Sequence, residues 1–133
     1  MNTALSNRNA LETLDMMCAC RAGEAARQHL LLLAGRHPHD AAVQYATARA
    51  HDRLGRGRDA VPFYRAAIQA GLSGDDLRGA YLGLGSAYRA LGMYHESADT
   101  LREGLQHFPD ATELRVFLAM TLYNLHECYD ASA

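Results

Sequence analysis

The sequence contains no lysine, because all 13 of its basic residues are arginine. It therefore cannot encode an enzyme that forms a Schiff base through lysine, or a phosphate-binding loop that uses one. Tryptophan is also absent. The three cysteines are an odd number, which does not suit a disulfide framework. We therefore expect a protein of a reducing compartment, the cytoplasm.

Long apolar runs are absent as well. The run Leu30–Leu33 is far shorter than the ~20 residues that span a bilayer. The first ten residues lack a basic segment followed by an apolar core, so no signal peptide is expected. The formal net charge of −2 gives the chain as a whole no attraction for nucleic acid or an anionic membrane. We therefore expect neither a membrane nor a nucleic-acid partner.

The most regular pattern in the chain lies in residues 81–109. It consists of two helical periods of apolar and small residues, the first ended by a glycine and the second by a proline. The first is Tyr81, Leu84, Gly85 and Tyr88, ended by Gly92, and the second is Ser97, Leu101 and Gly104, ended by Pro109. This stretch predicts a helix, a tight turn and a second helix.

The same landmarks recur at fixed distances along the sequence. Ala48, Gly55 and Ala60 lie 37 residues before Gly85, Gly92 and Ser97. Arg115, Leu118, Ala119 and Leu122 lie 34 residues after Tyr81, Leu84, Gly85 and Tyr88. Constant offsets over several landmarks indicate an internal repeat.

The order of these residues resembles the tetratricopeptide repeat. That pattern has an aromatic residue, Leu-Gly, Tyr, a small Ala, an aromatic residue and a closing Pro about every 34 residues. The third repeat matches through Tyr81 in the Trp place, Leu84-Gly85, Tyr88, Ser97 in place of Ala, Leu101 in place of the aromatic residue, and Pro109. The resemblance implies an all-α fold of antiparallel helix pairs, stacked as a right-handed superhelix. It also implies a small bacterial, cytoplasmic protein.

We predict about three repeats and a C-terminal helix, seven helices in all. The repeats would cover residues 7–38, 40–72 and 75–109, and a partial fourth unit would cover residues 111–128. The first repeat matches the pattern least well, and its first helix is expected from Leu11 to Arg21. Asp40 is the predicted N-cap of the first helix in the second repeat.

Two local features refine the helix boundaries. Ser73 followed by Asp76 predicts a capping box at the start of the third repeat. Pro62 falls inside the pattern of a helix, where it removes a hydrogen bond. That helix is therefore expected to begin late, near Arg58 or Asp59, or to be kinked.

Small side chains are expected where paired helices cross, because only they allow close approach. They are Ala48, Gly85 and Ala119 on the first helices, and Ala60, Ala67, Ser97 and Gly104 on the second helices. A glycine within a helix costs up to ~1 kcal/mol relative to alanine, so Gly85 and Gly104 need a packing reason of this kind.

Few residues suggest chemistry. His37, His39 and Asp40 match no zinc-binding pattern and lie where a turn between helices is predicted. His51 replaces the inward Tyr of its repeat, so we expect a packed and hydrogen-bonded histidine there. The carboxylates are spread singly along the helices. We therefore predict no catalytic residue, no metal ion, no cofactor and no enzyme activity.

The first helices of such repeats line a concave surface. Helical spacing places Tyr45, Arg49, Asp52 and Arg53 of the second repeat, and Leu82, Ser86 and Arg89 of the third, on that surface. The resemblance implies a protein–protein interaction module that binds a peptide segment or helix of a partner in this groove, with arginines as donors to carboxylates. A mixed, solvated surface without a ligand is the alternative. Asp52 and the net charge speak against an RNA binder.

One subgroup of the family holds a C-terminal carboxylate with lysine and asparagine. Because this chain has no lysine, that binding mode is not implied.

The C-terminal helix is apolar on nearly all sides. Leu118, Leu122 and Leu125 are expected to face the third repeat, and much of the remaining surface is Val116, Phe117, Met120 and Tyr123. Ends of repeat arrays normally carry a polar outer face, so these four residues are expected to be covered by a partner or a second copy. We predict a homodimer with a twofold, self-complementary contact. A structural self-association unit with no separate peptide ligand is the alternative function.

Overall fold

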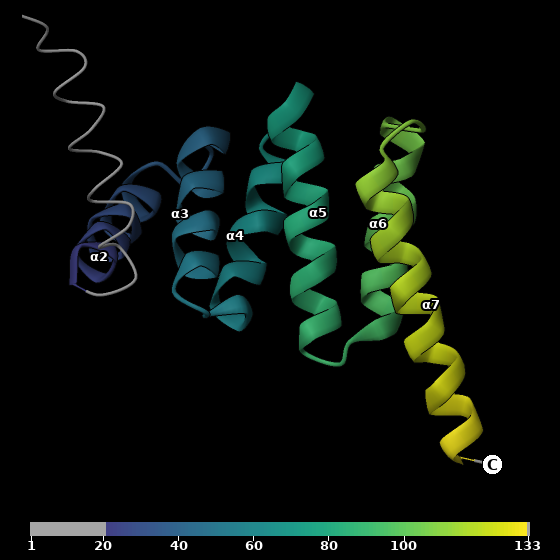
Figure 1. Cartoon of the computed structure of the whole chain (residues 1–133). Coiled ribbons are helices and arrows are strands. Elements are labelled where there is room, and N and C mark those ends of the chain that lie inside the picture. Colours follow the sequence, from purple (N-terminus) through teal and green to yellow (C-terminus); the bar gives the residue numbers. More distant parts are fainter. Residues whose placement is uncertain (1–20, 133) are drawn as a thin grey trace, which may run out of the picture.

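The computed structural model describes residues 21–132, which form α-helices joined by short turns (Figure 1). The helices are α2 (Arg21–Arg36), α3 (Ala41–Arg53), α4 (Gly57–Gln69), α5 (Gly74–Ala90), α6 (Tyr94–His107) and α7 (Thr112–Ser132). No strand occurs among these residues, which confirms the all-α prediction for this part of the chain. The predicted first helix, from Leu11 to Arg21, lies outside the described residues except for Arg21, which begins α2.

The helices follow one another across the molecule in chain order (Figure 1). Each packs against the next, and the first helices of successive repeats also contact each other, α3 with α5 and α5 with α7. No Cα atoms of the second helices α4 and α6 lie within 8 Å of each other. The first helices of successive repeats therefore pack against each other, whereas the second helices are separated.

Two turns close in the same way 37 residues apart. Gly55 and Gly92 have φ angles of 73° and 78°, in the left-handed region that glycine adopts without a steric penalty. The amide of Arg56 donates to the His51 carbonyl at 2.9 Å, and the amide of Met93 donates to the Tyr88 carbonyl at 2.8 Å. This is the Schellman pattern, and it explains why each first helix ends where it does.

The predicted cap at Asp40 is confirmed, because its side chain accepts from the amides of Ala42 at 3.1 Å and Val43 at 3.3 Å. The predicted capping box at Ser73 is wrong. Ser73 occupies the N-cap position of α5, but its side chain makes no capping hydrogen bond. The next residue, Gly74, has a φ of 61°, and this left-handed residue departs from the backbone geometry that a capping box requires.

Of the two alternatives predicted for α4, the late start near Arg58 or Asp59 is wrong, and the kink stays a prediction. The helix begins at Gly57 and runs through Pro62, which lies in its second turn. The missing amide of Pro62 deprives only the carbonyl of Arg58 of its helical partner. Both residues are exposed, so water can bond to that carbonyl. The proline is therefore tolerated without a break in the helix.

The core runs along the array as two connected clusters. One holds Ala48, Ala60, Tyr64, Ala80, Leu84 and Tyr88, and the other holds Tyr81, Leu101, Ala111 and Leu114. Ile68 packs against both clusters. His51 is buried beside the first, where its Nδ1 lies 2.8 Å from the Thr47 carbonyl and its ring stacks on Phe63 at 5.2 Å. The prediction of a packed, hydrogen-bonded histidine is confirmed.

The close crossing of α5 and α6 depends on Gly85. A β-carbon there would lie 2.5 Å from the Leu101 Cδ2 atom, closer than side chains pack. Ser97, also at this crossing, is fully buried and donates to the Gly85 carbonyl at 2.7 Å. The small residues predicted for this crossing are therefore placed correctly.

The predictions for the buried face of α7 are partly wrong. Ala119 and Leu122 are exposed, whereas Leu114 and Thr121 are fully buried against the preceding helices. Ala119 and Leu122 stand where Gly85 and Tyr88 stand in the third repeat, on the side that a second helix covers. No described helix follows α7, so that side remains open.

We expect Gly85→Ala to lower the free energy of unfolding by about 1–3 kcal/mol, because its β-carbon overpacks the crossing. Gly35→Ala is the matched control, since a β-carbon at Gly35 meets nothing within 4 Å and helix propensity favours alanine there. Urea denaturation of both variants checks this. If Gly85→Ala were as stable as Gly35→Ala, the crossing would not depend on glycine.

Candidate functional site

Nine residues occupy equivalent positions of α3, α5 and α7, 37 and 34 residues apart. Because these helices contact each other in turn, we infer that equivalent positions form three rows across them. The rows are Tyr45, Leu82 and Val116; Arg49, Ser86 and Met120; and Asp52, Arg89 and Tyr123. All are at least partly exposed. We call these nine residues, together with Arg53, the first-helix surface.

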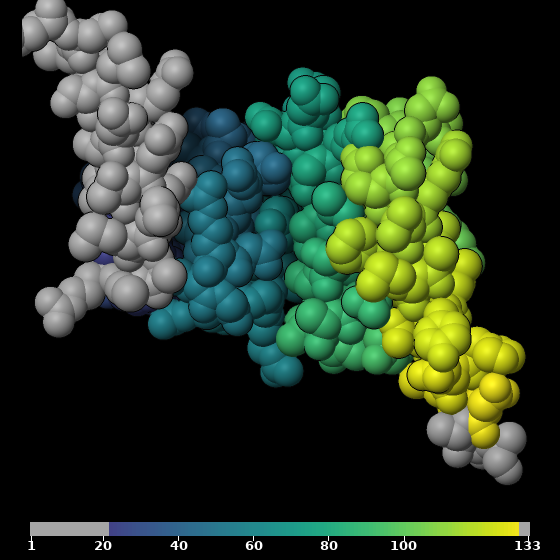
Figure 2. All heavy atoms as spheres, viewed as in Figure 1, coloured from purple at the N-terminus to yellow at the C-terminus, as the bar shows by residue number. Residues whose placement is uncertain are grey.

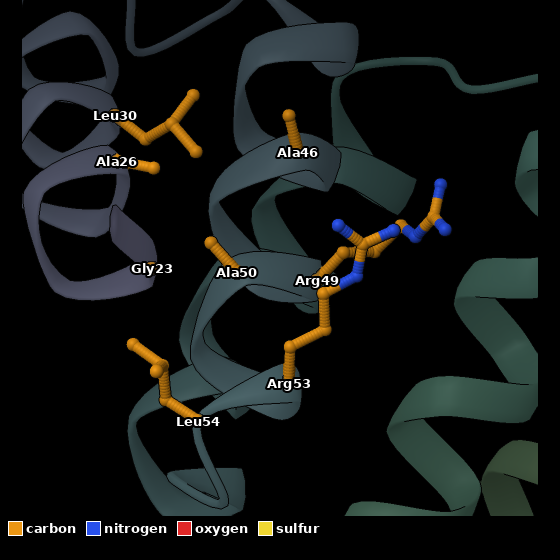
Figure 3. Close-up of a pocket in the computed structure, with 8 residues that line it drawn as sticks. All are labelled: Gly23, Ala26, Leu30, Ala46, Arg49, Ala50, Arg53 and Leu54. Atoms are coloured by element: carbon orange, nitrogen blue, oxygen red, sulfur yellow. The ribbon is translucent and has the colours of Figure 1, made fainter. Parts of the chain in front are cut away.

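The α3 part of the first-helix surface is cationic. The Arg49 guanidinium lies over the Tyr45 ring, 5.6 Å from its centroid, and Arg53 follows one turn later. Figure 3 shows both arginines extending from α3 on the side away from α2. Burial raises the pKa of the Tyr45 hydroxyl, and the nearby Arg49 opposes that rise. Both arginine side chains are exposed and can reach a carboxylate on a partner.

Asp52 belongs to the first-helix surface and is also hydrogen-bonded to a residue of the core. The buried Tyr64 hydroxyl of α4 donates to the Asp52 Oδ2 atom. Burial raises the pKa of the Asp52 carboxyl, and the hydrogen bond from Tyr64 opposes that rise. Burial and the Asp52 carboxylate together raise the pKa of Tyr64. Asp52 therefore links α3 to α4, a partnership that the spacing of residues could not indicate.

Polar contacts join the middle of the surface to α7. The Arg89 Nε atom donates to the Asn124 Oδ1 atom at 2.9 Å. Arg78 donates to both carboxylate oxygens of Glu113, with Nη2 at 2.8 Å from Oε2. The hydrogen bond from Arg78 is the largest cause that lowers the pKa of Glu113 to about 2. These contacts hold α7 at a defined place beside α5.

The α7 part of the surface is apolar. Val116, Met120 and Tyr123 are 50%, 38% and 62% exposed. Phe117, which we grouped with them from the sequence, instead lies half-buried against the core cluster that contains Leu101 and Leu114. That grouping is wrong for Phe117, because the residue faces the preceding repeat and not the open surface.

A second exposed apolar area lies where no described helix covers α7. It includes Ala119, Leu122 at 39% exposure and Tyr129 at 66%, with Met93 at the start of α6 at 40%. Figure 2 shows the C-terminal turns of α7 projecting beyond the rest of the array. We call these four residues the end face.

A hollow of about 220 Å³ lies between α2 and α3. Its lining is apolar apart from two arginines: Gly23, Ala26, Leu30, Ala46, Ala50 and Leu54, with Arg49 and Arg53. Figure 3 shows Leu30, Ala46 and Ala50 about the hollow while the arginine side chains extend away from it. The hollow therefore offers no acid, base or nucleophile for catalysis.

The described residues form neither a metal-binding cluster nor a membrane-spanning helix. Residues 21–132 hold no group of three or more His, Cys, Asp or Glu that could bind a metal ion. His37 and His39 lie exposed in the turn before α3, and Asp40 beside them serves as its cap. None of the described helices is both long enough and apolar enough to cross a bilayer.

The part of the chain that carries the first-helix surface is similar to a known protein family. The family model described as "Tetratrico peptide repeat" matches residues 41–133, the part of the chain that contains α3 to α7. No curated protein sequence matches the chain.

We expect Tyr64→Phe to lower the free energy of unfolding at neutral pH by about 1.5–3 kcal/mol, because Asp52 then keeps its burial but loses its donor. Without that donor the Asp52 pKa rises further, so the loss should shrink as pH falls and the carboxyl takes up a proton. Urea denaturation at neutral pH and below the ordinary Asp pKa of about 3.9 measures both effects.

The same substitution in an Asp52→Asn background is the control. There the cost should be smaller and independent of pH, since no carboxylate remains. A cost that is the same in both backgrounds would show that the charge of Asp52 adds nothing to the hydrogen bond, because an asparagine oxygen can still accept from the Tyr64 hydroxyl.

Proposed function

The chain belongs to the tetratricopeptide repeat family, and on that basis we propose that it binds a peptide segment or helix of a partner protein on its first-helix surface. The family is generally a non-enzymatic scaffold for protein interactions. The right-handed superhelix and the cytoplasmic location expected from the sequence belong to this proposal. In that geometry the first-helix surface would be a concave groove.

The observation that carries the proposal is the division of this surface into a cationic part and an apolar part. Arg49 and Arg53 lie on α3, while the exposed Val116, Met120 and Tyr123 lie on α7. Exposed apolar side chains gathered on one face of a monomer are typical of interaction sites. The matching partner is a segment with carboxylates toward α3 and apolar side chains toward α7.

We expect the double variant Arg49→Ala/Arg89→Ala to stay folded. It should capture roughly fivefold less of the partner from a lysate of the native host, because two donors to the partner's carboxylates are lost. Capture by the wild-type protein should also weaken as salt rises. Quantitative mass spectrometry of the captured proteins measures both effects. Arg36→Ala/Arg58→Ala is the matched control, with the same change of charge at exposed positions off this surface. Equal capture by the two double variants would place the site elsewhere.

A second candidate function is self-association through α7. It is favoured by the end face, where Leu122 and Tyr129 are exposed on a helix that also exposes Val116, Met120 and Tyr123. A twofold contact between two copies would cover these side chains. Phe117 is not part of that contact, since it is half-buried in its own chain.

We expect the wild-type protein to be a dimer at micromolar concentration and Leu122→Glu to be a monomer, because a buried unpaired carboxylate opposes the contact. Light scattering measures both masses. Leu32→Glu is the control, since Leu32 is 64% exposed on α2, far from the end face along the array. A monomeric wild-type protein, or a dimeric Leu122→Glu, would contradict self-association through α7.

A further inference from the structure

A second hollow, of about 410 Å³, lies between α4 and α6. The backbones of these two helices do not pack against each other, and the hollow opens between them over α5. Tyr81, Leu84 and Tyr88 of α5, with Ile68 of α4, contribute the apolar part of its lining. We call it the outer hollow.

The outer hollow is separate from the first-helix surface. On α5 the first-helix surface uses Leu82, Ser86 and Arg89, and the outer hollow uses Tyr81, Leu84 and Tyr88. At about 100° per residue, these two sets point roughly 130° apart around the helix. A partner in the outer hollow would therefore contact the second helices and leave the first-helix surface free.

The wall that α6 contributes is acidic. Glu96, Asp99 and Glu103 line it, at spacings of three and four residues that place them on one helix face. All three are exposed, and α4 contributes a single cation, Arg65, to the opposite wall. Asp99 forms an ion pair with Arg102 at 4.0 Å, the outer limit for such a pair. The negative electrostatic potential of these carboxylates attracts a cation and repels nucleic acid or an anionic membrane.

Thr100 adds a hydroxyl group to the lining of the outer hollow. It lines the hollow and is only 9% exposed. Buried threonines in this array bond to a carbonyl four residues earlier: Thr47 to Val43 at 2.7 Å and Thr121 to Phe117 at 2.8 Å. Within the described residues the Thr100 hydroxyl has no hydrogen-bond partner on the chain, and no side-chain oxygen or nitrogen there is both buried and unpaired, so this oxygen is accessible from the hollow. It is therefore available to a group that enters the hollow.

We propose that the outer hollow binds a cationic segment of a protein partner. An apolar side chain of that segment rests on Leu84 and Ile68, and its arginine or lysine side chains pair with Asp99 and Glu103. The Thr100 hydroxyl bonds to a polar group of the segment. Charge complementarity and the apolar lining together select a protein segment, since a simple polyamine has no apolar side chain to place.

The test uses the full chain, labelled with ¹⁵N, and the probe acetyl-Leu-Arg-Arg-Leu-amide. We expect saturable amide shifts at Thr100, Glu103 and Ile68, and none from acetyl-Leu-Glu-Glu-Leu-amide. No saturable shift, equal shifts from the acidic peptide, or equal shifts from spermidine would overturn the proposal.

Two variants locate the binding. Asp99→Asn/Glu103→Gln should raise the Kd of the arginine peptide by roughly fivefold. Asp110→Asn/Glu127→Gln changes the net charge equally at exposed positions outside the hollow and should leave the Kd unchanged. Equal weakening by both pairs would reduce the effect to overall charge and overturn the proposal.

Two further variants separate this site from other effects. Thr100→Val should lower the affinity for the peptide without lowering the melting temperature, because the hydroxyl has no hydrogen-bond partner in the folded chain. Unchanged affinity would show that Thr100 does not contact the peptide. Arg49→Ala/Arg89→Ala should bind the peptide as the wild type does. This variant therefore distinguishes loss of binding on the first-helix surface from loss of binding in the outer hollow. A loss of peptide binding in that variant would place the peptide on the first-helix surface instead.

Discussion

The rest of this structure depends on how closely the paired helices can cross. At the α5–α6 crossing, Gly85 lets the Leu101 side chain approach the backbone of α5, and the fully buried Ser97 bonds to the Gly85 carbonyl at 2.7 Å. Ala48 and Ala60 stand at the equivalent positions of the preceding repeat and are also fully buried. Close pairs of this kind let the first helices contact one another in turn while α4 and α6 stay apart. The first-helix surface and the outer hollow are two consequences of this one arrangement.

Polar contacts fix the angle at which the repeats meet. The Ser97 hydroxyl lies 3.1 Å from the Thr121 hydroxyl, so α6 and α7 share a buried polar link. Arg78 with Glu113 and Arg89 with Asn124 join α5 to α7 at two points along their length. A single surface ion pair such as Arg78–Glu113 contributes little to stability, and we infer that these two contacts serve mainly to position α7. They hold α7 so that its apolar side chains continue the rows that begin on α3.

Much of the fold could be predicted from the sequence, because the repeat offset transfers information from a clear repeat to a weaker one. The stops at Gly55 and Gly92 and the buried His51 follow from that offset. The partnership of Tyr64 with Asp52 could not be predicted, because it depends on the distance between two helices and not on spacing within one. Phe117 and Leu122 lie on other sides of α7 than the sequence predicts, for a related reason. A helix that is apolar all round gives no preferred face, and only the packing of Leu114 and Thr121 decides its orientation.

The central claim is that partners bind across α3, α5 and α7. Hydroxyl-radical footprinting of the chain, alone and with a partner captured from its host, tests this most directly. The account predicts that bound partner lowers the oxidation of Tyr45, Met120 and Tyr123, while Met93 and Tyr129 of the end face react as before. Protection of Met93 and Tyr129 with no change at Tyr45, Met120 and Tyr123 would contradict it.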